Sequence, residues 1–133
     1  METITVATPE REVLVDITSE VERVVRASGV PDGICIVFVP HTTAGITINE
    51  NADPSVKTDI ANFLGKLIPQ HAGFRHMEGN ADAHIKASCM GSSETILIEK
   101  GSLVLGTWQG ICFAEFDGPR TRKVHIRILG SQQ

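Results

Sequence analysis

The chain has 133 residues, of which 41% are hydrophobic, and a formal net charge of −4. This length supports one hydrophobic core but not two ordinary domains, so we expect a single domain over residues 1–133. The basic residues are dispersed, which excludes the basic stripe typical of nucleic-acid-binding proteins. No apolar run is long enough to span a membrane, and the first residues lack the basic start of a signal peptide. We therefore expect a cytoplasmic protein without a membrane partner.

The first half of the chain predicts strands around one helix. Polar and apolar residues alternate at 3–6 and 12–17, which indicates two short strands. Thr18 or Ser19 can cap a helix that Gly29 ends. Every residue of the run 34–39 is apolar, which predicts a central strand buried on both faces. Alternation returns at 44–50 and predicts a half-buried strand.

The second half predicts two more helices and a strand-rich end. Asp53 followed by Pro54 is typical of a helix start, and apolar residues over 56–67 form one face of about three turns. A short helix is expected within 80–91. Strands are predicted at 94–99, 103–116 and 122–129. The fold class is therefore α+β, with antiparallel β-sheets in a sandwich and about three helices.

Polar residues that can carry chemistry gather in two segments. The first is 74–86, which contains Arg75, His76, Glu78, Asn80, Asp82, His84 and Lys86. The second precedes it and contains His41, Thr42, Thr43, Asn49, Glu50, Asn51 and Asp53. Imidazoles and carboxylates are common metal ligands, while Arg and Lys bind phosphate. We hypothesise that the two segments meet in the fold and form one site.

Two kinds of metal site are consistent with these residues. His41, His76 and His84 together with an open position would hold a catalytic divalent ion such as zinc. Alternatively, the carboxylates of both segments would form an oxygen-rich magnesium site completed by phosphate. Without a metal, the same residues are a hydrogen-bonded polar loop, and Asp53 is only a helix cap.

A third candidate region begins at Glu115, which shares a strand face with apolar residues. A charge in that position needs a partner, and Arg120 or Arg122 can pair with an acid or grip a phosphate. The alternative is a charged turn that closes a hairpin. Trp108, the only tryptophan, packs in a core or an interface or else contacts a ring-shaped ligand.

Several motifs in order resemble the YjbQ family. They are His41-Thr-Thr-Ala, Thr47-Ile-Asn-Glu-Asn-Ala-Asp-Pro, Arg75-His, Ala83-His-Ile-Lys and Gly106-Thr-Trp-Gln-Gly with Glu115. The resemblance implies a compact sandwich that associates as a homotrimer. It also implies a thiamine-phosphate synthase of low activity, which joins a pyrimidine pyrophosphate to a thiazole phosphate. The family's polar positions fall on His41, Asn49, Glu50, Asp53, His76, His84, Trp108, Gln109 and Glu115.

The expected function is a small metal-assisted enzyme that acts on a phosphorylated metabolite. The alternatives are a metal-dependent hydrolase and a non-catalytic trimeric module that binds a small anion or metabolite. The metal ligands are expected to be His41, His76 and His84, with zinc or magnesium as the ion. The expected catalytic residues are Glu50, Asp53, Glu78 and Glu115. The expected phosphate-binding residues are Thr42, Thr43, Asn49, Arg75, Lys86, Arg120 and Arg122.

Overall fold

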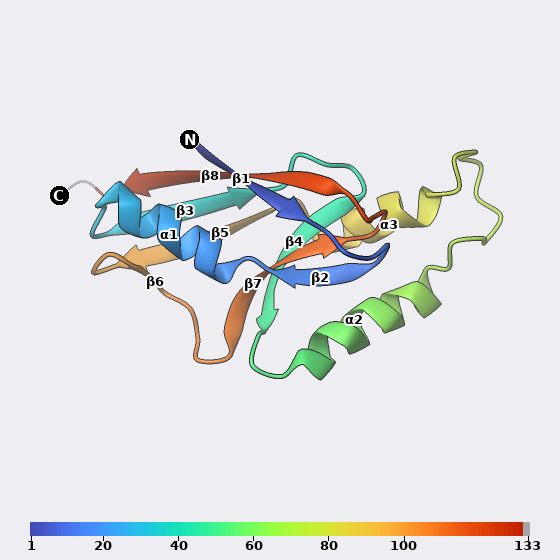
Figure 1. The fold of residues 1–133 in the computed structure, drawn as a ribbon, viewed down its shortest axis with the longest axis horizontal. Helices are drawn as coiled ribbons and strands as arrows, with labels where there is room; N and C mark the ends of the chain where they lie inside the picture. Colours follow the sequence, from blue (N-terminus) through green and yellow to red (C-terminus); the bar gives the residue numbers. More distant parts are fainter. Residues whose placement is uncertain (132–133) are drawn as a thin grey trace.

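Two antiparallel sheets face each other in the computed structural model, which describes residues 1–131 (Figure 1). Residues 132 and 133 of the expected domain lie outside the described residues. The larger sheet has the order β1–β8–β3–β5–β6, formed by Glu2–Ala7, Thr121–Gly130, Gly33–Phe38, Ser93–Glu99 and Ser102–Leu103. The smaller sheet has the order β2–β7–β4, formed by Val13–Asp16, Gln109–Glu115 and Ala44–Glu50.

Three helices complete the described part of the chain. Helix α1 (Thr18–Ser28) ends at Gly29, whose φ of 69° places it in the left-handed region that favours glycine. Helix α2 (Pro54–Leu67) starts as predicted, because the Asp53 carboxylate accepts a hydrogen bond from Ser55 N at 3.0 Å. Helix α3 (Ala81–Met90) follows a loop over residues 68–80. The predicted α+β sandwich in one compact domain is confirmed.

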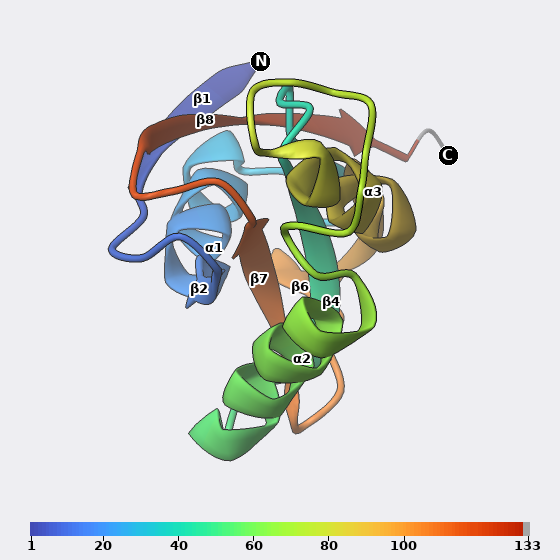
Figure 2. The same cartoon turned by 90° about the vertical axis from the view of Figure 1, so that its right-hand side faces the viewer.

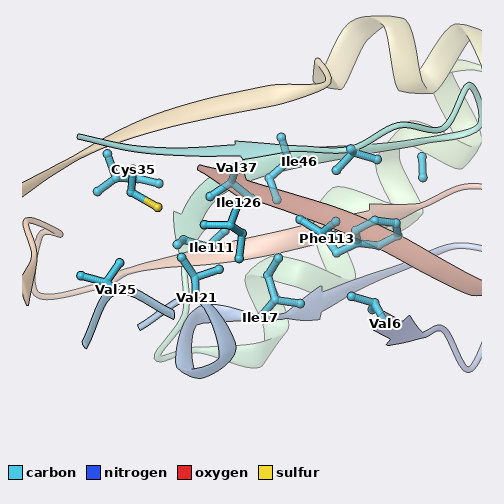
Figure 3. Packing of buried hydrophobic residues seen from close by; sticks show 14 of the residues in the cluster. Val6, Ile17, Val21, Val25, Cys35, Val37, Ile46, Ile111, Phe113 and Ile126 are labelled. Carbon is cyan, nitrogen blue, oxygen red and sulfur yellow. The ribbon is translucent and has the colours of Figure 1, made fainter. Parts of the chain in front are cut away.

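The main core lies between the two sheets, and α1 closes one side of it. Figure 3 shows Val21 and Val25 of α1 among Ile126 of the larger sheet and Phe113 of the smaller one. These side chains are almost entirely inaccessible to water. Burial of such apolar surface is the main favourable contribution to folding.

A second apolar cluster lies on the opposite face of the smaller sheet, which α2 and α3 cover (Figure 2). The cluster includes Cys112 and Ala114 of β7 together with Ala83 and Ala87 of α3. Because one cluster lies on each face, β7 is the strand buried on both sides. We predicted that 34–39 is the strand buried on both faces, and this prediction is wrong. The outer face of β3 is open, and Phe38 is 43% exposed.

Two further element predictions need correction. The strand expected at 103–116 is split into β6 and β7, which belong to different sheets because the chain crosses between the sheets at 104–108. The apolar face of α2 is only partly buried, because Phe63 and Leu67 remain 64% and 63% exposed. The structure therefore leaves apolar surface on both β3 and α2.

Candidate functional site

The structure brings together two of the three predicted metal ligands. His76 lies in the 68–80 loop and His84 in the first turn of α3, and their ring centroids are 5.3 Å apart in an edge-on arrangement of 79°. Glu78 Oε2 lies 3.8 Å from His76 Nε2, and both side chains are open to solvent. We call His76 and His84 the imidazole pair. It offers ring nitrogens to a metal or ring N–H donors to an anion.

The imidazole pair lies beside a helix start that has no side-chain cap. Asn80 precedes α3, but its side chain does not accept a bond from the first turn. Instead, Asn80 Nδ2 donates to Asp117 Oδ2 at 2.9 Å, and Asn80 Oδ1 is buried without a hydrogen-bond partner. The first amides of a helix have no acceptor within the helix, and the helix dipole makes this end favourable for an anion. The helix start therefore lies next to two imidazoles, and its first turn also carries the buried Asp82 carboxylate.

His41 does not join the imidazole pair. Its Nε2 accepts a hydrogen bond from Lys123 N at 3.0 Å, which anchors the ring beside the start of β8. Burial, followed by the nearby Arg122 charge, lowers the pKa of His41 and favours the neutral ring. Within residues 1–131, no three His, Cys, Asp or Glu side chains are grouped so that they could hold one metal ion. The tri-histidine site stays a prediction.

Glu115 is held by protein donors on both oxygens. Arg122 Nε donates to Oε1 at 2.8 Å, and Arg122 Nη2 also contacts Oε2. Thr8 donates to Oε1, while the amides of Phe116 and Asp117 donate to Oε2. Burial acts to raise the pKa of Glu115, but the hydrogen bonds from Arg122 and Thr8 hold it below its usual range.

Glu115 of β7 is linked to β8 through Arg122, and Arg122 extends the link to the residue before β4. Arg122 Nη2 donates to Thr43 Oγ1 at 2.9 Å, so Thr43 also belongs to this buried network. Arg120, by contrast, is half exposed and pairs with Asp117 at 3.0 Å. The catalytic role of Glu115 and the phosphate role of Arg122 and Thr43 stay predictions, but these groups are already occupied by protein partners.

Lys86 lies in a second buried ionic network rather than at a surface. Its ammonium donates to Asp82 Oδ2 at 2.8 Å and contacts Glu12 as well. Arg11 donates to both oxygens of Asp82, at 3.0 and 3.2 Å. Burial acts to raise the pKa of Asp82, but bonds from Arg11 and Lys86 lower it overall. This network ties α3 to the start of β2, and Lys86 faces carboxylates where a phosphate role was predicted.

The residues Asn49, Glu50 and Asp53 form a self-contained turn at the far end of β4. Asn49 Oδ1 accepts from Glu50 N, Glu50 Oε2 accepts from Ala52 N, and Asp53 caps α2. Hydrogen bonds from Ser55 lower the pKa of Asp53. The carboxylates of this turn lie at the surface.

The same turn packs against the segment that contains Trp108. Asn51 N donates to Trp108 O at 2.8 Å, and Lys57 donates to Asn51 Oδ1 at 2.6 Å. A Cβ atom at Gly110 would lie 2.4 Å from Asn51 Cγ, so only glycine permits this approach. The Trp108 side chain itself is 64% exposed. Sequence reasoning did not find the Asn51–Lys57 contact.

The two predicted segments meet only in part. His41 and Thr43 lie at the same end of the sandwich as α3, because Thr43 bonds Arg122 and Asn80 bonds Asp117. Glu50 lies seven residues further along β4, a separation of about 20 Å. Figures 1 and 2 show that β4 ends near the start of α2, whereas the 68–80 loop follows the other end of α2. Within one chain, therefore, only the His41 end of the first segment lies near the second, and the hypothesis that the two segments form one site stays a prediction.

The fold and the motifs of this chain recur in known proteins. A family model described as UPF0047 protein YjbQ-like matches residues 2–131. The UPF0047 protein MJ1081 of Methanocaldococcus jannaschii is 59% identical over 127 residues, which cover 96% of this chain and 92% of that protein. The UPF0047 protein YugU of Bacillus subtilis is 49% identical over 131 residues, which cover 98% of this chain and 99% of that protein.

Solved structures agree with the sequence relatives. An uncharacterized YjbQ/UPF0047 protein from Clostridium acetobutylicum superimposes with a TM-score of 0.95 at 55% identity and covers 97% of this chain and 100% of its own. A protein of unknown function from Sulfolobus solfataricus gives a TM-score of 0.93 at 38% identity, with 98% and 96% coverage. No helix in the described residues is both long and apolar enough to cross a membrane. This chain belongs to the YjbQ-like UPF0047 family.

Proposed function

We propose that this protein is a metal-assisted enzyme that acts on a small phosphate ester at the imidazole pair. The observation that carries the proposal is the placement of His76 and His84 5.3 Å apart beside the uncapped start of α3. Two imidazoles suit a divalent ion, and a free helix start suits the phosphate that such an ion binds. Further ligands would come from substrate oxygens or from another copy of the chain.

Thiamine phosphate synthesis is the specific reaction that we propose. The thiazole nitrogen attacks the methylene of the pyrimidine pyrophosphate, so that a carbon–nitrogen bond forms. The carbon–oxygen bond breaks, and its electron pair leaves with pyrophosphate. A bound divalent ion would neutralise the charge that develops on pyrophosphate. Arg75, which is exposed beside His76, and the first amides of α3 would orient the phosphates.

We further propose that a homotrimer brings Glu50 of one copy to the imidazole pair of the next. Within one chain, α2 separates these groups by its 14 residues, or about 20 Å. The surface between them is apolar, because Phe63 and Leu67 are exposed on α2. A groove of about 480 Å³ is lined by Phe63 and Leu64 of α2 and by Asn49 of β4. A ring of copies in head-to-tail contact would cover this surface and complete the site.

The proposed reaction is tested with the two thiamine precursors and either Mg²⁺ or Zn²⁺. Product and released pyrophosphate are measured for the wild type, for His84→Gln and for His125→Gln. His125 is the control because it lies on the outer face of the larger sheet, where it bonds Thr3 and stacks on Phe38. We expect turnover in the wild type and the control, with a loss of about 100-fold or more in His84→Gln.

Other outcomes would separate the remaining functions. Hydrolysis of simple phosphate esters without joining of the precursors would favour a hydrolase, in which Glu78 activates water beside His76. Saturable binding of a precursor without turnover would favour a non-catalytic module. Equal activity in His84→Gln and in the wild type would contradict the assignment of the site to the imidazole pair.

A further inference from the structure

The two neighbours of β8 do not cover it to the same extent. Strand β3 pairs with β8 as far as Gly130, opposite Gly33. Strand β1 pairs with β8 only as far as Ile126, opposite Glu2. Residues 127–130 therefore have a paired neighbour on one side alone. Alternate residues of an antiparallel strand direct their N–H and C=O groups to each side, so the uncovered side offers donors and acceptors for another strand.

This free edge borders a groove between α1 and the end of β8. The groove has a volume of about 670 Å³. Its apolar lining includes Val24 and Ala27 of α1 and Ile126 and Ile128 of β8. This volume lies within the range of pockets that bind small ligands and short peptide segments. An occupant of the groove would thus meet apolar side chains and unpaired backbone groups together.

The charges beside the groove are mainly basic. Arg23 of α1 and Arg127 of β8 line it, and Glu2 is the single carboxylate in its lining. Neither arginine takes part in an ion pair within residues 1–131. The cross-strand neighbour of Arg127 on β3 is Ile36, which offers no charge. A carboxylate on an added strand would face Arg127 from the other side.

We propose that this groove binds an extended acidic peptide segment of another protein, which adds to β8 as a further strand. Main-chain groups of the segment would pair with residues 127–130, as in other cases of strand addition. Side chains that point inward would be apolar and pack on Ile128 and Val24. The alternate side chains would be acidic and pair with Arg127. The proposal does not depend on the function assigned to the imidazole pair.

The probe for this site is a capped, fluorescein-labelled peptide of alternating Val and Glu residues. Its binding is measured by fluorescence anisotropy and compared with that of an alternating Val and Lys peptide. We expect micromolar affinity for the acidic peptide and a loss of about tenfold or more in Arg127→Glu. The basic peptide should bind Arg127→Glu more tightly than it binds the wild type. Arg127 is exposed, so its replacement should leave the fold intact.

The matched control is Arg26→Glu, which makes the same charge change on α1 at a position outside this groove. It should alter the affinity for the acidic peptide by less than about twofold. Amide shifts in nuclear magnetic resonance spectra should change at residues 127–130 and in α1 near Ala27. This pattern would support strand addition.

Three results would overturn the proposal. The first is the absence of binding at a peptide concentration of about 1 mM. The second is a loss of affinity in Arg26→Glu equal to that in Arg127→Glu, which would indicate nonspecific attraction between the acidic peptide and the basic residues of the protein. The third is binding of decanoate at the groove with no binding of the peptide, which would indicate a site for a small apolar anion.

Discussion

Lys86 and Asp82 form an ion pair from which water is almost excluded. The ammonium lies 2.8 Å from the carboxylate, one helical turn apart in α3, and the two side chains are 1% and 0% exposed. Arg11 and Glu12 supply the remaining charges around them. Each charge in this group is therefore paired, and removal of one would leave the buried network with an unbalanced charge.

Replacement Lys86→Met should destabilise the protein strongly. We expect the free energy of unfolding to fall by about 3–5 kcal/mol, because the Asp82 carboxylate would lose a buried cation. Urea denaturation followed by circular dichroism measures the effect. The control is Lys66→Met in the last turn of α2, where the side chain is exposed and the change should stay below about 0.5 kcal/mol. Unchanged stability in Lys86→Met together with weaker phosphate binding would restore the predicted phosphate role.

Stability should fall in acid because two buried carboxylates have lowered pKa values. Folding holds the pKa of Asp82 below 3.8 and that of Glu115 below 4.5, since Arg11, Lys86 and Arg122 favour the charged forms. A lowered pKa in the folded state contributes stability that is present above the ordinary value and is lost as the pH falls through the folded-state value. The free energy of unfolding should therefore decrease below about pH 4.5.

The measurement for this pH dependence is a series of urea titrations between neutral pH and pH 3. The double variant Glu115→Gln with Arg122→Met removes both charges of one pair and should flatten the decrease. A curve for the double variant that is parallel to that of the wild type would show that the Glu115–Arg122 pair does not cause the acid loss.

Mixing of two inactive variants should restore activity if copies share the site. In Glu50→Gln the imidazole pair is intact, and in His84→Gln the turn at the other end of β4 is intact. Random assembly of the two chains into a head-to-tail ring gives an intact combination at about one quarter of the sites. Coexpression should thus recover about a quarter of the wild-type turnover. No recovery in mixed trimers would contradict a site that is formed by two copies.

The exposed apolar face of α2 should be required for assembly. Leu67→Glu places a charge in the surface that we propose to lie between copies, so the trimer should dissociate while the monomer stays folded. Light scattering coupled to size-exclusion chromatography measures the mass. Leu97→Glu is the matched variant, since Leu97 is 61% exposed on the outer face of the larger sheet. Dissociation of Leu97→Glu alone would place the contact between copies on that sheet instead.

Local patterns in the sequence predicted most element positions. The strand at 44–50, the Asp53 cap and the end of α1 at Gly29 depend on residues that are near one another in the chain, and all three were found as predicted. The depth of burial was less predictable. An apolar run does not reveal which sheet covers it, so 34–39 looked like the strand buried on both faces although β7 has that position.

In the site, too, contacts between residues near in the sequence were easier to predict than contacts that depend on how the elements pack. His76 and His84 are eight residues apart in the sequence, and the loop and first turn of α3 bring them together. The Asp82–Lys86 pair could have been predicted, because residues four apart on a helix lie on one face. The contacts of Arg11 and Glu12 with them could not, since they depend on how β2 packs beside α3. The separation of Glu50 from the imidazole pair likewise depends on the direction of β4.

The most direct test of the proposed site is the metal content of untagged protein purified without chelator. Mass spectrometry should detect a divalent transition metal at close to one ion per chain in the wild type and in His125→Ala. The metal should be lost in His76→Ala and in His84→Ala, while circular dichroism shows that both remain folded. Retention of the full metal content in either variant would contradict metal binding by the imidazole pair.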